Sequence, residues 1–121
     1  MKTIAVSAIE KSFDSPVDPR FGRAKYFVVV DPETMEWEVL DNTSNNNAAH
    51  GAGIQTARLV SQHRIKTVLT GNCGPNAFQT LQAAGIQVAI GVNSTVRQAV
   101  ERFKRGEINM AQNPNVKGHW S

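Results

Sequence analysis

The second half of the chain alternates short apolar runs with longer amphipathic stretches, and this alternation constrains the fold more than any other feature. Apolar runs at residues 66–69 and 87–92 predict strands, while residues 75–84 and 95–105 have the spacing of helices that bury one face. Strands that alternate with helices pair in parallel and are joined by right-handed crossovers. The second half is therefore expected to form a parallel sheet with covering helices.

The first half of the chain adds strands of a different kind. Residues 2–8, 26–30 and 36–40 have the buried or alternating patterns of strands, and Asp31-Pro32-Glu33-Thr34 is a turn signal between the last two. These two strands are expected to form an antiparallel hairpin at one edge of the sheet. Residues 52–63 give one more helix. The expected fold class is α/β, with a mixed five-stranded sheet and three helices on both faces.

Length and composition set the broad class of protein. The 121 residues, of which 40% are apolar, fit one globular domain. We expect residues 1–110 to form this domain and residues 111–121 to form a flexible C-terminal tail that carries His119 and Trp120. The N-terminus does not resemble a signal peptide, and no apolar run is long enough to span a membrane, so a cytoplasmic protein is expected.

The formal net charge of +3 is mild. It permits an anionic ligand but does not require nucleic acid, and neither a nucleic acid nor a membrane is expected as a partner. The basic residues between Arg97 and Arg105 are interpreted as the solvated face of a helix.

The loop from Thr70 to Asn76 is the first candidate for a binding site. It follows an apolar run and precedes a helix, so its glycines lie where unpaired backbone N–H groups and the helix dipole favour an anion. The loop holds Cys73, the single cysteine of the chain. One cysteine cannot supply the several thiolates that usually hold an iron–sulfur cluster. A cluster whose coordination is completed by its own sulfides needs only an anion cradle.

Other loops are expected beside this one. In open α/β sheets, ligands bind outside the carboxyl ends of the strands. The loops after Ser7 and after Val92 end there, and the helix start at His50-Gly51-Ala52-Gly53 should join them. Arg20 and Arg23 offer fixed positive charge to an anion, or they pair with Asp18 or Asp14 and order their own loop.

Three motifs give the chain a family resemblance that extends to about Gly106. They are Asp18-Pro19-Arg20-Phe21-Gly22-Arg23 followed by Tyr26-Phe27, then Asn42 followed by His50-Gly51-Ala52-Gly53-Ile54-Gln55, and finally Thr70-Gly71-Asn72-Cys73-Gly74-Pro75-Asn76-Ala77. In this order and spacing the chain resembles the dinitrogenase iron–molybdenum cofactor biosynthesis domain family, and within it the small stand-alone members. Loops of the third type often have an apolar residue at the Cys73 position.

The resemblance implies a fold and a function. It implies a ribonuclease-H-like sheet and a protein that binds, carries or stores a metal–sulfur cluster, not an enzyme. The cluster would be a molybdenum–copper sulfide or a nitrogenase cofactor precursor, and the partners would be proteins that deliver or accept it. The residues expected to contact the cluster are Arg20, Asn42, His50, Gly51, Gly53, Gly71, Asn72, Cys73, Gly74 and Asn76, with His50 and Cys73 as possible metal ligands.

Simpler interpretations of these residues stay open at this point. Cys73 can be a small packed side chain, His50 an exposed loop residue, and Asn42 the cap of a turn. Two other functions compete. A binding or regulatory module for a phosphate-containing ligand would have similar glycine loops, although no G-x-G-x-x-G or Walker pattern is present. A nuclease needs converging carboxylates, and the first strand offers Ser7 instead of an acid.

Overall fold

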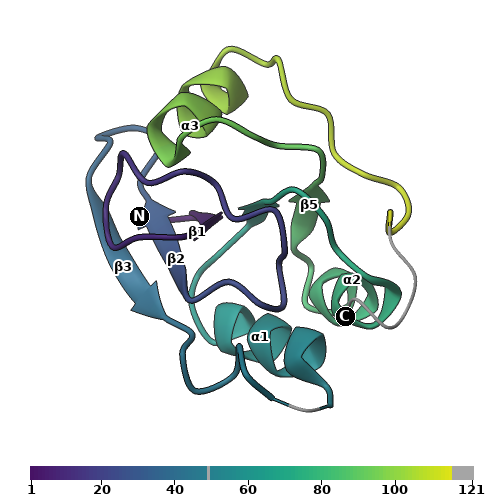
Figure 1. Ribbon diagram of the computed structural model, residues 1–121. Coiled ribbons are helices and arrows are strands. Elements are labelled where there is room, and N and C mark those ends of the chain that lie inside the picture. The colour runs from purple at the N-terminus through teal and green to yellow at the C-terminus, as the bar shows by residue number, and fades with distance from the viewer. Residues whose placement is uncertain (49, 116–121) are drawn as a thin grey trace.

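A five-stranded mixed sheet runs through the centre of the protein (Figure 1). The computed structural model describes residues 1–48 and 50–115. The strands lie in the spatial order β3-β2-β1-β4-β5. Their bounds are β1 Ile4–Ala8, β2 Tyr26–Val30, β3 Trp37–Asp41, β4 Thr67–Leu69 and β5 Gln87–Ala89.

The pairing of the strands agrees with the two halves expected from the sequence. β1, β4 and β5 are parallel to one another, and β2 is antiparallel to both β1 and β3. The turn between β2 and β3 is closed by Asp31, whose Oδ1 accepts the backbone N–H of Glu33 at 2.9 Å. The hairpin therefore extends the parallel part of the sheet at one edge, as predicted.

Three helices cover the sheet, two on one face and one on the other (Figure 1). They are α1 (Ala52–Ser61), α2 (Pro75–Ala83) and α3 (Val96–Lys104). α1 and α2 pack together on one face, where Ala57 and Leu81 join the same buried cluster. On the other face, Val96 and Val100 of α3 pack with a second cluster. The expected arrangement of three helices on both faces is confirmed.

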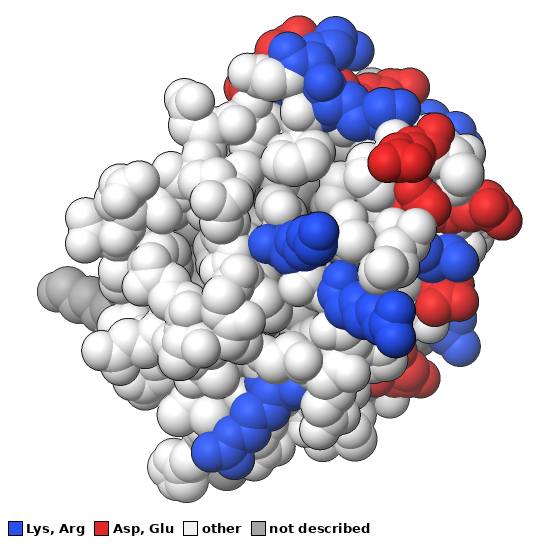
Figure 2. Space-filling model, turned by 180° about the vertical axis from the view of Figure 1, so that it is seen from behind, with Lys and Arg blue, Asp and Glu red and all other residues white. Residues whose placement is uncertain are grey.

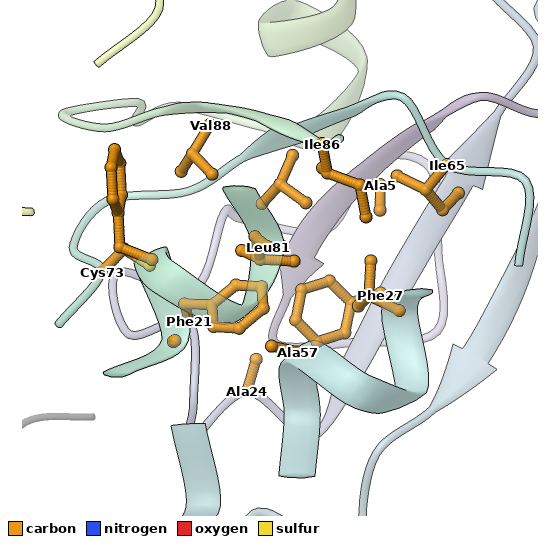
Figure 3. Close-up of a cluster of buried hydrophobic side chains, with 14 of the residues drawn as sticks. Ala5, Phe21, Ala24, Phe27, Ala57, Ile65, Cys73, Leu81, Ile86 and Val88 are labelled. Carbon is orange, nitrogen blue, oxygen red and sulfur yellow. The ribbon is translucent and has the colours of Figure 1, made fainter. Parts of the chain in front are cut away.

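Strand alternation divides the core into these two clusters. On the α1/α2 face, Phe27 meets Phe21 edge to face with 5.3 Å between the ring centroids, and Figure 3 shows both rings among side chains from the sheet and helices. On the α3 face, Val6 and Val28 lie opposite each other in the β1–β2 ladder and are fully buried. Because successive side chains of a strand point to opposite faces, both sides of the central strands are apolar.

The last strand is shorter than the apolar pattern at residues 87–92 predicts. β5 ends at Ala89, since the next backbone groups turn toward the loop after β4. The N–H of Gly91 donates to the carbonyl of Gly71 at 2.8 Å, and that of Val92 donates to the carbonyl of Thr70 at 3.0 Å. Residues 90–92 therefore position the β4–α2 loop instead of extending the sheet. β2 has the expected bounds, and the remaining elements differ from theirs by one or two residues at their ends.

The chain after α3 returns to the body of the protein. The N–H of Ala111 donates to the carbonyl of Val88 in β5 at 2.7 Å, and Asn115 bonds to Cys73 in the β4–α2 loop. Residues 111–115, expected in a flexible tail, are therefore hydrogen-bonded to the domain. The rest of that tail, with His119 and Trp120, lies outside the described residues. No helix within residues 1–48 and 50–115 has the length and apolar character needed to cross a membrane.

We predict that Leu81→Ala lowers the free energy of unfolding by about 2–5 kcal/mol, because it empties a fully buried position between α2 and the sheet. Urea unfolding followed by circular dichroism measures the change. The matched control is Gln82→Ala, an exposed position of the same helix, which should stay within about 0.5 kcal/mol of the unchanged chain. Equal losses in the two variants would contradict the packing described for α2.

Candidate functional site

The segment from Asp18 to Gly22 lies at the carboxyl ends of β1 and β4, and hydrogen bonds hold it from both strands. The N–H of Asp18 donates to the carbonyl of Ser7 at 2.8 Å, and the Ser7 hydroxyl donates to the carbonyl of Asp18 at 2.7 Å. The same hydroxyl lies 2.8 Å from Oγ1 of Thr70, the residue that follows β4. Two buried hydroxyl groups thus join this segment to the sheet, and each has a hydrogen-bond partner, as burial requires.

The β4–α2 loop binds the same segment further along. The side-chain amide of Asn72 donates to the carbonyl of Pro19 at 2.9 Å, and the N–H of Phe21 donates to the carbonyl of Asn72 at 3.1 Å. Arg20 and Asn72 therefore lie side by side in a short parallel bridge. Asn115 reaches the loop from its other side, where its Oδ1 accepts the N–H of Cys73 at 2.9 Å.

Two glycines allow these loops to approach one another closely. A Cβ on Gly71 would lie 2.7 Å from the Cα of Pro19 and 2.8 Å from its carbonyl oxygen. A Cβ on Gly22 would lie 2.9 Å from the Cα of Gly53 in the first turn of α1. No other residue fits where backbone meets backbone at such distances. The Asp18–Gly22 segment is thus packed between the β4–α2 loop and the start of α1. The close backbone approach expected at Gly71 is made by Pro19 of the protein itself.

A cavity of about 470 Å³ opens beside this segment, toward the loop after β3. Such a volume is within the roughly 300–1,000 Å³ of small-ligand sites. Three of its lining residues are cations and one is a carboxylate. The lining residues are Ile9, Asp18, Pro19, Arg20, Arg23, Lys25, Asn46 and Asn47. The excess of positive charge in this cavity favours an anionic occupant.

The two arginines of the cavity play different parts. Arg23 donates from Nη1 to the carbonyl of Asn46 at 3.1 Å and to that of Ala48 at 2.8 Å, so it fixes the loop that leads to α1. Arg20 has its Nε 3.9 Å from Oδ1 of Asp18, and half of its side chain is exposed. A guanidinium that is held loosely by one carboxylate keeps donors available for another anion.

The cavity also has one polar atom that is not satisfied. Oδ1 of Asn46 is buried and has no hydrogen-bond partner within the part of the chain that the structure describes. An unpaired buried acceptor costs free energy, on the order of 1–3 kcal/mol. A change in this loop that gives the atom a partner would recover that cost.

Two helices begin without side-chain caps near this end of the sheet. Gly51 precedes α1 and Gly74 precedes α2, and neither helix start has a side-chain hydrogen bond to its first turn. By contrast, α3 starts with a capping box between Thr95 and Gln98. The unpaired N–H groups at the starts of α1 and α2 carry partial positive charge. This charge adds to that of the cavity.

Two of the residues expected at the site are buried within the fold. Asn42 is fully buried, and its side-chain amide donates to the carbonyl of Ala24 at 2.8 Å and to Oγ1 of Thr56 at 3.0 Å. Cys73 belongs to the core cluster on the α1/α2 face, as Figure 3 shows, and burial raises its pKa to about 12. The Cys73 sulfur is therefore packed among apolar side chains, and Cys73 does not line the cavity.

The other expected residues lie around the same end of the sheet. His50 and Gly51 are exposed at the start of α1, and Asn76 is exposed in the first turn of α2. Gly53 packs on Gly22, and Gly74 is buried just before α2. Across residues 1–48 and 50–115, no group of three or more His, Cys, Asp or Glu side chains is arranged to hold a metal ion. The expected metal ligands His50 and Cys73 therefore do not belong to such a group.

Sequence reasoning missed part of the cavity wall. Lys25 lies between Arg23 and Tyr26, and Asn46 and Asn47 lie between Asn42 and His50, at positions to which the sequence motifs assign no role. The run of asparagines after β3 indicated only a polar loop. The contacts of Arg23 with the carbonyls of Asn46 and Ala48 bring this loop to the cavity, and main-chain contacts of this kind leave no signal in residue type.

Comparison with known proteins connects this site to a family. The family model described as "Dinitrogenase iron-molybdenum cofactor" matches residues 1–106. The chain belongs to this family. The match includes the Asp18–Gly22 segment, the cavity loops and the β4–α2 loop, so the site described above lies within the shared domain.

Solved structures agree with this assignment. The apo form of the orange protein from Desulfovibrio gigas is 50% identical, with a TM-score of 0.92 over 96% of this chain and 98% of that one. A candidate NifB protein from Thermotoga, of the DUF35 family, is 32% identical, with a TM-score of 0.83 over 98% and 100% of the two chains. An uncharacterized protein of Methanocaldococcus jannaschii is 27% identical over 95 residues, which are 76% of this chain and 80% of that protein.

We predict that Gly71→Ala lowers the free energy of unfolding by about 1–3 kcal/mol, because the new methyl group must push the Pro19 backbone away. NMR spectra should show displaced amide resonances for residues 20–22 and for Asn72. The control is Gly106→Ala, which meets no atom within 4 Å and adds only the strain of a positive φ. It should destabilise the protein without moving those resonances. Unchanged resonances in Gly71→Ala would refute the close packing of the two loops.

We also predict that the Cys73 thiol is unreactive in the folded protein. Burial raises its pKa to about 12, so the thiolate stays scarce as the pH rises from 7 to 10. Labelling with a thiol-specific disulfide reagent should be slow across this range and should become fast when urea unfolds the chain. Rapid labelling of the folded protein at pH 8 would show that the sulfur is accessible.

Proposed function

We propose that this protein binds and carries an anionic metal–sulfur cluster, without covalent ligation, in the cavity beside the Asp18–Gly22 segment. The observation that carries this proposal is the cavity itself, in which three cations and one carboxylate line about 470 Å³. Membership of a family described by the iron–molybdenum cofactor of dinitrogenase supports a cofactor-related cargo. The orange protein, at 50% identity, supports the same class of function.

Charge and hydrogen bonding support an occupant that brings its own sulfide ligands. Arg20 and Lys25 carry charge into the cavity, and Arg23 strengthens it while holding the neighbouring loop. N–H donors on cationic groups make strong hydrogen bonds to anionic acceptors. The protein atoms described here offer no set of metal ligands, so the metals of the cargo would keep their own sulfides.

Eight of the expected contact residues fall into three groups under this proposal. Arg20 lines the cavity, and we propose that it contacts the cluster together with His50 and Gly51, which are exposed a few residues after Asn47 of the cavity wall. Gly53, Gly71 and Asn72 act by holding the Asp18–Gly22 segment, as their contacts with Gly22 and Pro19 support. Gly74 and Asn76 bring the partial positive charge at the start of α2.

The proposal also covers the metals of the cluster. We propose a molybdenum–copper sulfide, with a nitrogenase cofactor precursor as the alternative. A carrier of this kind does no chemistry of its own and exchanges its cargo with delivering and accepting proteins, and we place it in the cytoplasm.

We further propose that the fold is of the ribonuclease-H-like type, which the strand order with an antiparallel β2 supports. A nuclease is disfavoured, since β1 contributes Ser7 at the carboxyl edge and no acid.

We predict that the purified protein takes up tetrathiomolybdate together with copper and keeps the resulting absorbance through gel filtration. Arg20→Ala should weaken this uptake by about 1–3 kcal/mol, the scale of a hydrogen bond to a charged group. The control is Arg58→Ala, which removes an exposed cation of α1 that does not line the cavity. Absorbance titration without oxygen, with metal and sulfide analysis of the eluted protein, measures the effect.

Two outcomes would contradict the proposal. If the unchanged protein takes up no cluster, the cargo is wrong. If Arg20→Ala and Arg58→Ala weaken uptake equally, the cluster does not bind in this cavity. A phosphate-containing ligand suits the same positive charge, so calorimetry with inorganic phosphate and with nucleotides is the companion measurement. Heat of binding with phosphate compounds, without uptake of the thiometallate, would favour a regulatory module.

A further inference from the structure

The outer edge of β3 is an unpaired sheet edge. β3 is the last strand on its side of the sheet, and Figure 1 shows no element beyond it. The opposite edge differs, because Ala111 donates its N–H to Val88 of β5 there. Among the described residues, no main-chain group pairs with the outer side of β3. An exposed strand edge is a template for another strand unless the protein blocks it.

The register identifies the main-chain groups that point outward. In an antiparallel pair, residues that bond to the partner strand alternate with residues whose N–H and C=O groups face away. Glu36 accepts from Asp31 and Asn42 donates to Lys25, so the even-numbered positions of β3 bond inward. The odd-numbered residues Trp37, Val39 and Asp41 therefore direct their N–H and C=O groups away from the sheet.

Trp37 gives this edge a large exposed side chain that is held in place. Its ring stacks on Phe13 with 5.9 Å between centroids and 18° between planes, and Arg97 lies over the Phe13 ring at 4.5 Å. Arg97 is fixed in turn by Asp14, with 2.7 Å between Nε and Oδ1. Even so, 41% of Trp37 stays exposed. Rigid, exposed aromatic side chains are frequent anchors of protein interfaces.

The hairpin that carries this edge is acidic in sequence. Residues 26–57 contain five acidic residues and no Lys or Arg, in a chain whose net charge is +3. Of the five, only Asp31 forms an ion pair within the described residues. Figure 2, seen from behind, shows acidic side chains along the margin where β3 lies, with basic side chains between them. The four without an ion pair are Glu33, Glu36, Glu38 and Asp41, although Lys2 and Arg64 line a pocket together with Glu38 and Lys11 lies near enough to Asp41 to lower its pKa.

The acidic residues of β3 indicate which kind of strand could pair with this edge. A second copy of the chain would bring the same carboxylates against Glu36 and Glu38, and like charges opposite one another destabilise a pair of strands. Lys and Arg on an added strand would instead find unpaired carboxylates. We propose that the edge of β3 binds an extended, basic segment of a partner protein by strand addition, with Trp37 as the anchor. This inference is independent of the cargo of the cavity.

The test uses a capped peptide of sequence Lys-Val-Lys-Val-Lys-Val and NMR of the ¹⁵N-labelled full chain. We expect saturable shifts at the amides of Trp37, Val39 and Asp41 and at the Trp37 indole. Glu38→Lys should weaken the peptide about threefold or more, as expected when a favourable cross-strand pair becomes repulsive. The matched charge control is Glu107→Lys, an exposed position after α3 that pairs with Arg105, which should leave the affinity unchanged.

A second variant separates strand addition from simple charge attraction. Val39→Pro removes one outward N–H and leaves the inward bonds of β3 intact, since proline is tolerated on edge strands. It should abolish the shifts while the β2 resonances keep their dispersion. The proposal is overturned if the Val39→Pro variant binds the Lys-Val-Lys-Val-Lys-Val peptide as tightly as the unchanged chain does. It is equally overturned if the unchanged chain binds a Lys-Pro-Lys-Pro-Lys-Pro peptide as tightly. It is also overturned if no shift appears at millimolar peptide, or if β3 shifts depend on protein concentration alone, which would indicate a second copy.

Discussion

The contact between the Asp18–Gly22 segment and the β4–α2 loop is the constraint on which the site depends. The backbone of Pro19 lies directly against Gly71, and Ser7 and Thr70 join this segment to two parallel strands through buried hydroxyl groups. This contact sets where Arg20 lies and leaves the cavity open on the other side of the segment. A change of one methyl group at Gly71 thus acts on the site without touching a ligand.

The division between the two arginines follows from this arrangement. Arg23 donates from one nitrogen to two carbonyl oxygens of the loop after β3. Arg20 instead has its Nε 3.9 Å from the Asp18 carboxylate. A site for a bulky anion needs both roles, because fixed walls and free donors cannot come from the same group. The family to which the chain belongs is described by the iron–molybdenum cofactor of dinitrogenase.

The element order of the fold could be predicted from the sequence because each element has a clear local signal. The apolar run of β4, the proline that starts α2 and the turn at Asp31-Pro32 all act within a few residues. The site was harder to predict, because it is built from main-chain contacts between distant loops. Cys73 is the clearest example: a glycine loop with a lone sulfur suggested a ligand, and the fold turns that sulfur into the core. Lys25 and Asn46 join the cavity through contacts that residue types do not encode.

The path of the chain after α3 changes how the domain should be delimited. The family model ends at residue 106, yet Ala111 occupies the free edge of β5 and Asn115 bonds to three residues of the β4–α2 loop. The shared sequence signal therefore stops before the structural unit does. A domain cut at the family boundary would open a second sheet edge and remove the hydrogen bonds from Asn115 to the β4–α2 loop, so the natural unit for transplantation or fusion extends at least to residue 115.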